Sequence, residues 1–347
     1  MKLFKHFFMF QMWAVLGTTT TTGTVTNAVQ EYLDRVLLLK GLPLLTHVLF
    51  GRRTVVPKNS GEKAKFVRIN SLAAATTPLT EGTNPDSTSW GDTTVEATLA
   101  QYGAYLETSD FKDMTEQSVV LNGLADTLGE QMGLTADTVC RGVINGGTSV
   151  LLANSVAART DIVSKVAKAD LDRLIIQLAT GKARKQTEMY KPGHAGLEPI
   201  ESCYPVIVHS HLKFSIIAAA GTSWVPRAKY PAGTPTFEGE FGSYDDLRFI
   251  ATTEGKTWAD GGGAIGTTGL RSTGGTKVDV YSILALGKDA FGVVPLADGD
   301  NVRIIIKTKE EAGGALEMSG TMGWKLAVVY KILNDNFMAR LEVGAPK

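Results

Sequence analysis

One long polar segment, LTEGTNPDSTSWGDTTVEATLAQYGAYLETSD, limits what this chain can fold into. It covers residues 79–110 and contains no Lys, Arg, His or Cys. Its first half carries Pro, Gly and Asn-Pro turn signals, and its second half alternates, with Val95, Ala97 and Leu99 on one face. Residues 63–69 alternate in the same way before it, so the two segments predict an extended two-stranded ribbon. Because an isolated ribbon is only marginally stable in water, it must lie against another surface.

Charge changes sign within this ribbon. The whole chain has 35 Lys and Arg against 35 Asp and Glu, so no overall basic field favours nucleic acid. Basic residues gather before residue 70 and acidic residues follow it, which suits contact with another copy, although two solvated surfaces are the alternative. The candidate contacts between subunits are Arg52, Arg53, Lys63, Lys65, Glu81, Asp86, Asp92 and Glu96.

Composition places the chain among globular proteins. Hydrophobic residues make up 44% and charged residues 20% of the chain, as in globular proteins. Its length of 347 residues is enough for one large domain or two ordinary ones. The chain has only two cysteines, Cys140 and Cys203, which excludes a secreted disulfide scaffold. Both are expected to behave as small buried apolar residues.

The N-terminal segment MKLFKHFFMFQMWAVLG has the outline of a signal peptide, with Lys2 and Lys5 before an apolar run. The run is shorter than the roughly 20 residues that a membrane-spanning helix needs. Gln11 interrupts it and the cleavage pattern is poor, so a packing segment is favoured and export is the alternative.

Periodicity predicts a mixed order of helices and strands. A long helix carries a stripe of apolar side chains and ends at residues 145–147, and its glycines are expected to pack closely against another backbone. A helix at 168–183 has Asp170 as its expected N-cap, and a third helix is expected at 25–39. Residues 255–276 read as a mobile glycine-rich loop. The stripe consists of Leu121, Leu124, Leu128, Met132, Thr135, Val139 and Val143, and strands are predicted at 204–210, 246–252, 277–287, 301–308 and 321–345.

Catalytic and ligand motifs are weak throughout the sequence. Gly255-Lys256-Thr257 has the ending of a phosphate-binding loop, but Ile250 stands where that motif needs glycine. His209 and His211 have no further metal ligand at fixed spacing, and Cys140 lies on the apolar stripe. We therefore predict no enzyme activity, no metal and no cofactor.

Several motifs in order resemble one family. They are PKNSGEKAKFVRINSL, ATTPLTEGTNPDS, ATLAQYGAYLETSD, LGEQMGLTADTVCRGVINGGT, YPVIVHSHL, FEGEFGSYDDLRFIAT and GTMGWKLAVVYKILNDNFMARLEVGA. Together they resemble the major capsid proteins of podovirus-like tailed bacteriophages over roughly residues 25–347. The resemblance implies the Johnson fold, an α+β fold with an N-terminal arm, an extended β-hairpin loop, a long spine helix in a peripheral domain, and an axial domain.

The family pattern also implies a division of this chain. Residues 1–50 would be the N-terminal arm, with 1–17 an atypical extension; 51–112 the extended β-hairpin loop, with limbs near 63–69 and 93–108 and a tip at 77–92; 113–165 and 316–347 the peripheral domain, with the spine helix at 113–147; and 166–315 the axial domain.

The resemblance further implies a structural function. Copies would assemble as pentamers and hexamers into the icosahedral shell that encloses a double-stranded DNA genome, in the virion, after assembly in the host bacterial cytoplasm. Implied partners are a separate scaffolding protein, a portal, decoration proteins and non-specific contacts with packaged DNA, with no membrane. The alternatives are the shell protein of a cargo-loading encapsulin-like nanocompartment and, more remotely, a secreted β-rich hydrolase or binding protein.

Overall fold

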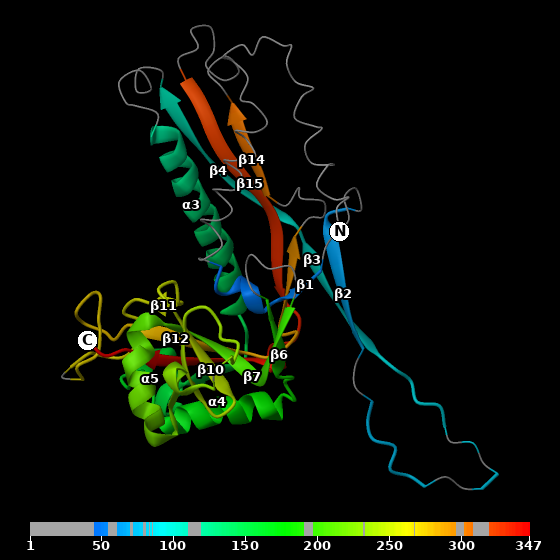
Figure 1. The fold of residues 1–347 in the computed structure, drawn as a ribbon. Coiled ribbons are helices and arrows are strands. Elements are labelled where there is room, and N and C mark those ends of the chain that lie inside the picture. The colour runs from blue at the N-terminus through cyan, green and yellow to red at the C-terminus, as the bar shows by residue number, and fades with distance from the viewer. Residues whose placement is uncertain are drawn as a thin grey trace, which may run out of the picture.

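The chain folds into an elongated unit, a compact unit and a projecting ribbon (Figure 1). The computed structural model describes residues 45–54, 61–69, 72–78, 81–82, 84, 86–109, 119–190, 197–231, 233–266, 268–295, 302–307 and 319–347. The helix expected at 25–39 lies outside these residues. A helix packed along one sheet forms the elongated unit, and a larger sheet with two helices forms the compact unit.

The elongated unit is built on the longest strand of the chain. Its five-stranded sheet comprises β1 (Arg52–Arg53), β4 (Ala100–Ser109), β13 (Phe291–Pro295), β14 (Val302–Lys307) and β15 (Ser319–Ile332). The strand β15 pairs antiparallel with β13, β14 and β4, and β1 adds to β13 in parallel. Alternation sends Met322, Trp324 and Leu326 into the core beneath helix α3 (Val119–Ile144). The Trp324 Nε1 donates a hydrogen bond to the Gln131 Oε1 at 3.2 Å.

The compact unit is built on a nine-stranded mixed sheet with the order β5-β16-β12-β7-β10-β9-β8, to which β11 and β6 add. Its buried core joins Leu171, Leu174 and Leu178 of α4 to Leu212 and Ile216. The elements are β5 (Val150–Leu152), α4 (Lys168–Thr180), β6 (Gln186–Tyr190), β7 (Leu197–His209), α5 (Lys213–Ala220), β8 (Val225–Pro226), β9 (Glu240–Tyr244), β10 (Leu247–Thr252), β11 (Thr257–Trp258), β12 (Val280–Leu286) and β16 (Met338–Gly344). Short 3-10 turns occupy Val48–Phe50, Ala153–Ser155, Arg159–Asp161, Ser210–Leu212, Gly221–Ser223, Arg227–Lys229 and Asp335–Phe337.

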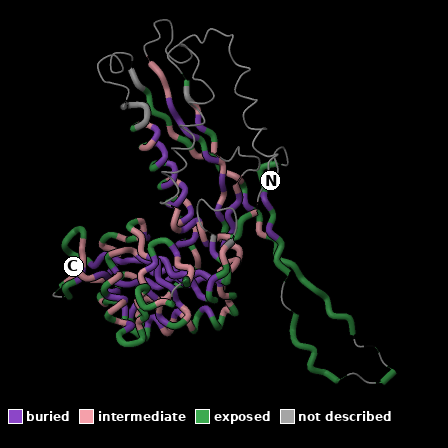
Figure 2. The backbone as a smooth tube through the Cα atoms, in the orientation of Figure 1, coloured by how far each residue is buried: buried purple, intermediate pink, exposed green. Residues whose placement is uncertain are grey.

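The ribbon is a separate sheet of β2 (Lys63–Ile69) and β3 (Asp92–Thr98), paired antiparallel. Its base is anchored to the elongated unit: Ala64, Phe66 and Ala97 are buried with Val294 of β13. The Phe66 ring lies directly over Gly292, where an added Cβ would come within 2.7 Å of it. The rest of the ribbon projects away from both units, as the exposed green trace in Figure 2 shows.

The second limb of the ribbon is shorter than the sequence predicts. The limb expected near 93–108 ends at Thr98, and residues 100–109 form β4, which leaves the ribbon and pairs with β15 along its whole length. The inward-facing positions change from odd to even numbers between the two strands, from Ala97 and Leu99 to Tyr102 and Ala104. Tyr102 and Ala104 pack against the core under α3, which is why β4 joins the larger sheet.

Strand pairing also departs from the expected domain limits. The strands β13 and β14 fall within 166–315 by sequence, yet both lie in the elongated unit. The strand β16 falls within 316–347, yet it pairs with β12 and β5 in the compact unit. Because strand partners are distant in sequence, the boundaries could not be placed from local pattern. The assignment of these units as peripheral and axial domains stays a prediction.

Local features of the helix α3 differ from the sequence prediction. The helix expected at 113–147 is described over α3, and 113–118 lie outside the described residues. Thr135 does not belong to its buried stripe, which passes through Ala136 instead. The prediction that the helical glycines pack closely against another backbone is wrong for Gly123 and Gly142, where an added Cβ would meet nothing within 4 Å.

Two carboxylates also play roles that the sequence did not indicate. Asp170 is the third residue of α4 rather than its N-cap, and its carboxylate accepts hydrogen bonds from the backbone N–H groups of Ala167 and Asn154 at 3.1 Å. The segment 255–276, expected as a mobile loop, is hydrogen-bonded to the compact unit. The carboxylate of Asp279 accepts from the Asp260 N–H at 2.8 Å, and the Val278 N–H donates to a glycine carbonyl at 2.9 Å.

Replacing Gly142 by alanine is expected to stabilise the isolated chain. A helical glycine costs about 1 kcal/mol relative to alanine, and the added methyl meets no neighbour. Urea unfolding of Gly142→Ala should therefore show a gain of about 0.5 to 1 kcal/mol. Gly292→Ala is the contrasting variant, because its methyl would collide with Phe66, and it should lose stability. A loss in Gly142→Ala would show that α3 is packed more closely at this position.

Candidate assembly interface

Three of the candidate charged residues meet within one ribbon. Lys63 and Lys65 lie on the same face of β2, and each pairs with Glu96 on β3, with nitrogen–oxygen distances of 3.7 Å and 3.0 Å. The hydrogen bond from Lys65 and the charge of both lysines lower the pKa of the Glu96 carboxyl below 4.5. All three side chains are exposed, so salt and water screen the attraction. The opposite charges foreseen from the sequence are therefore paired across the ribbon.

The remaining candidates lie at the two ends of the hairpin. Arg52 and Arg53 sit on β1 near the base, and the Arg52 Nε is 4.0 Å from an oxygen of Asp289. Glu81, Asp86 and Asp92 are exposed in the distal part. No Lys or Arg occurs between residues 69 and 111, so the distal part is uniformly acidic.

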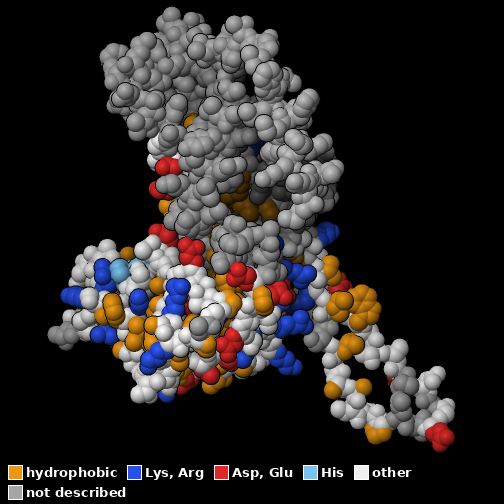
Figure 3. Space-filling view, in the orientation of Figure 1, with side chains coloured by type: hydrophobic (Ala, Val, Ile, Leu, Met, Phe, Trp, Pro, Cys, Tyr) orange, Lys and Arg blue, Asp and Glu red, His pale blue; other side chains and the backbone are white. Residues whose placement is uncertain are grey.

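The structure adds exposed apolar residues that sequence reasoning missed. Val67 is 60% exposed, Ile69 68%, Leu72 59% and Trp90 67%, all in the distal part of the hairpin. Figure 3 shows hydrophobic side chains, in orange, along the projecting arm. The signal was present, because Val67 and Ile69 share the outward face of β2 with Lys63 and Lys65. Several exposed large apolar side chains on one projecting arm indicate a protein–protein contact.

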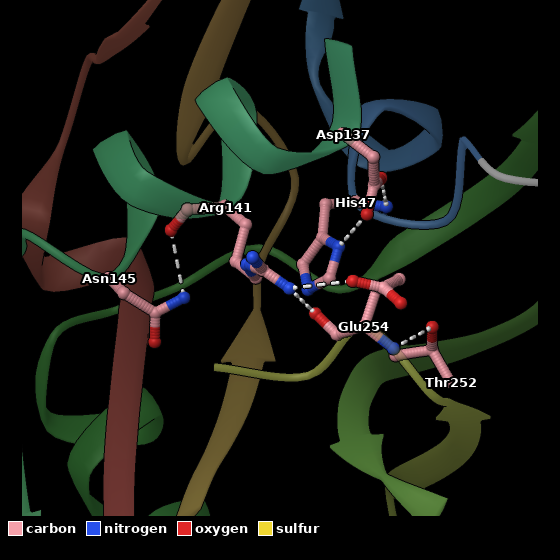
Figure 4. A network of polar contacts seen from close by, with 6 residues as sticks. All are labelled: His47, Asp137, Arg141, Asn145, Thr252 and Glu254. Atoms are coloured by element: carbon pink, nitrogen blue, oxygen red, sulfur yellow. Dashed lines mark hydrogen bonds and ion pairs between the residues drawn. The ribbon is translucent and has the colours of Figure 1, made fainter. Parts of the chain in front are cut away.

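A buried polar network joins the units at the base of the hairpin (Figure 4). The Nδ1 atom and the backbone N–H of His47 each lie 2.7 Å from the carboxylate of Asp137 on α3, and both residues are fully buried. One turn further, Arg141 donates to the backbone carbonyl of Glu254 and lies 3.3 Å from its carboxylate. The side chain of Asn145 accepts a hydrogen bond from Ser282 on β12 at 2.7 Å. The C-terminal half of α3 is thus tied to both the segment before the ribbon and the compact unit.

The histidine pair stabilises a loop. The His209 Nδ1 accepts a hydrogen bond from the backbone N–H of His211 at 3.1 Å, and the His211 Nδ1 lies 3.2 Å from the Tyr281 hydroxyl. Burial, together with the charges of His211 and Arg271, lowers the pKa of His209 from 6.5 to about 4. Among the residues that the structure describes, no group of three or more His, Cys, Asp or Glu could hold a metal ion.

The two cysteine thiols lie in the buried core. Burial raises the pKa of the Cys203 thiol to about 12 and that of the Cys140 thiol well above its usual value. Both cysteines are free and buried, as the sequence predicted. Within the described part of the chain, no helix has the length and apolar character needed to cross a membrane.

Comparison with known proteins shows a shared fold without detectable family membership. No protein-family model matches the sequence, and no curated protein matches it. The capsid of Ralstonia phage GP4 matches with a TM-score of 0.64 at 11% identity, over 86% of this chain and 88% of that chain. The capsid of Helicobacter pylori bacteriophage KHP30 matches with a TM-score of 0.59 at 11% identity, over 84% and 86%. The capsid of Cyanophage P-SCSP1u matches with a TM-score of 0.56 at 13% identity, over 85% and 87%.

These likenesses confirm the predicted fold class. The chain has the α+β fold of tailed-phage capsid proteins, the Johnson fold, with 84% to 86% of its length covered by these matches. Identities of 11% to 13% leave the fold as the shared property, so the function needs its own argument.

Removing His47 should be far more damaging than removing an exposed partner of the ribbon. His47→Ala removes the imidazole from the buried Asp137 carboxylate and leaves it the backbone N–H of residue 47, and breaking a buried pair by removing one side chain costs about 3 to 5 kcal/mol. Lys65→Ala is the matched control, because its partner Glu96 is exposed and retains Lys63, so no measurable loss is expected. Chemical unfolding measures both, and equal losses would contradict a structural role for the buried pair.

Acid should destabilise the chain through His209. Between the ordinary histidine pKa of 6.5 and the folded value of about 4, the unfolded chain binds a proton that the folded chain does not. The free energy of unfolding should therefore fall as the pH drops from 7 to 4.5, by about 1 to 2 kcal/mol after solvent screening of the half-buried ring. His209→Gln should flatten this slope, whereas the more exposed His211→Gln should keep most of it. An unchanged slope in His209→Gln would contradict the assignment.

Proposed function

We propose that this chain is the major capsid protein of a tailed bacteriophage and builds its icosahedral shell. The fold shared with phage capsid chains supports the proposal. The observation that carries it is the projecting ribbon, whose distal part exposes Ile69, Leu72 and Trp90. No other part of the described chain covers them, and large apolar side chains exposed together on a projecting arm are costly in a protein that remains alone in water. Burial against a neighbouring copy removes that cost.

Assembly follows from repeated contacts of this kind. Copies form pentamers and hexamers around closed symmetry axes, and the ribbon of each copy lies on a neighbour. The elongated unit with α3 acts as the peripheral domain, α3 being its spine helix, and the compact unit acts as the axial domain. Of the eight charged candidates, Glu81, Asp86, Asp92, Arg52 and Arg53 contact neighbours, while Lys63, Lys65 and Glu96 also hold the two strands of the ribbon together.

The proposal extends to partners and location. The chain resides in the virion after assembly in the host bacterial cytoplasm, aided by a separate scaffolding protein, and a portal and decoration proteins complete the particle. With zero net charge, it contacts packaged DNA through phosphates only, and this contact weakens as salt rises. The shell is structural and uses no catalytic residue or cofactor.

Shortening the hairpin tests the proposal. Deleting residues 77–91 leaves 70–76 to join β2 to β3, outside the buried base that anchors the ribbon. The variant should unfold at the same temperature as the parent chain but fail to form closed particles, as judged by sedimentation and electron microscopy. Thr88→Ala, an exposed change in the same loop, should assemble normally. Closed shells from the deletion would refute the role of the ribbon.

Neighbouring genes separate this proposal from the nanocompartment shell. A terminase gene and a portal gene beside this one support the phage shell. An enzyme gene whose product carries a docking tail contradicts it and supports the cargo-loading compartment.

A further inference from the structure

The face of the five-stranded sheet that points away from α3 carries a groove. Alternation directs Tyr105, Gly323 and Lys325 to this face, opposite to Trp324 and its buried neighbours. At the β13 end, the base of the ribbon covers the same face through Phe66. At the β14 end lies an open groove of about 470 Å³, here called the sheet groove, lined by Gly103, Tyr105, Ile305, Lys307, Gly323 and Lys325.

Two glycines make the floor of the sheet groove. Gly103 pairs with Lys325 and Gly323 pairs with Tyr105 across β4 and β15. An added Cβ on Gly323 would lie 2.7 Å from the Tyr105 Cβ, and one on Gly103 would lie 2.8 Å from the Trp324 carbonyl oxygen. The absence of side chains at both positions lowers the surface of the sheet between the flanking Tyr105 and Ile305. The result is an apolar depression on an otherwise flat strand face.

The rim of the sheet groove is basic. Lys307 and Lys325 line it, and Arg303 pairs directly opposite Lys325 across β14 and β15. Like charges directly opposite each other destabilise a sheet. The one acidic residue in the described strands β4, β14 and β15 is Glu107, which pairs with Thr321 on the edge opposite to Lys307. An acidic, apolar partner would relieve the repulsion and fill the depression.

The ribbon has that chemistry, but the ribbon of the same chain points elsewhere. Residues 86–92 combine Asp86 and Asp92 with the exposed indole of Trp90 and include no basic residue. The ribbon leaves the sheet at its base and extends away from β14, as Figure 1 shows, because β3 leads directly into β4 through Leu99. A ribbon that fills the sheet groove must therefore come from another copy.

We propose that the sheet groove binds residues 86–92 of a second copy, with Trp90 in the depression and the acidic residues against Lys307 and Lys325. A tryptophan contributes a large apolar area and also attracts cations placed over its ring. The N-terminal segment of the chain is the other apolar candidate, but Lys2 and Lys5 would bring like charge to a basic rim. This inference rests on the proposed function, because it requires copies to meet in a shell.

Photo-cross-linking from inside the groove tests the proposal. Tyr105, which is 70% exposed, is replaced in the full-length chain by the photoreactive residue p-benzoylphenylalanine. Shells are assembled from a mixture of unlabelled and ¹⁵N-labelled chains, irradiated and mapped by mass spectrometry. We expect cross-links to residues 86–92 with mixed isotopes, which mark two different copies. Cross-links to residues 1–17, to any other segment, or none at all would overturn the proposal.

A charge variant provides the matched control. Lys325→Glu places an acid opposite Arg303, so the isolated chain should be at least as stable as the parent chain, while the cross-link yield should fall roughly tenfold. Lys331→Glu, also exposed on β15 but opposite Gly292 at the covered end, should keep the yield. An unchanged yield in Lys325→Glu would overturn the role of the basic rim.

The two proposals fail in different ways. Shells that form normally but cross-link elsewhere overturn the sheet groove alone and leave the proposed function intact. A parent chain that stays monomeric under every assembly condition overturns the proposed function, and the groove inference with it.

Discussion

A two-stranded ribbon has two faces. In a single chain, the buried part of these faces is the part that the rest of the same chain contacts. Here that part is the base, where Phe66 fits over Gly292 and beside Val294. Beyond it the strands keep their mutual hydrogen bonds, but Ile69 on β2 and Trp90, two residues before β3, are exposed to water. The hydrophobic effect penalises this exposure in proportion to its area. Under the proposed function, the rest of the architecture supports an arm whose exposed apolar side chains are buried by another copy.

The support depends on β15. This strand pairs with β4 on one edge and with β13 and β14 on the other. The base of the ribbon, the helix α3 and the sheet groove therefore all lie against the sheet that is centred on β15. The buried pair of His47 and Asp137 then ties the segment before β1 to the same helix.

The sequence predicted the strong local signals well. The stripe through Leu128 and Met132 marked α3, and the alternation of residues 63–69 marked β2. It was misleading where the signal had two interpretations. An aspartate is suited both to the N-cap and to the third position of a helix. The structure places Ala167 at the N-cap of α4, so Asp170 is the third residue. A helical glycine such as Gly142 reads as a close-packing site, whereas its neighbourhood is open. The sheet groove had no sequence signal, because Gly103 and Gly323 are more than two hundred residues apart and meet only through strand register.

The amino-acid sequence alone determined that the chain carries an acidic, turn-rich ribbon, a long amphipathic helix and a series of separate strand segments. Each of these features depends on side chains within a few positions of one another. The tertiary structure decided which strands share a sheet. It moved β4 from the ribbon to β15, placed β16 beside β12, and paired Lys65 with Glu96 inside one copy. The reason is physical: alternation specifies which face of a strand is apolar, but every apolar face can be buried by several partners, and only the packing of the whole core selects one.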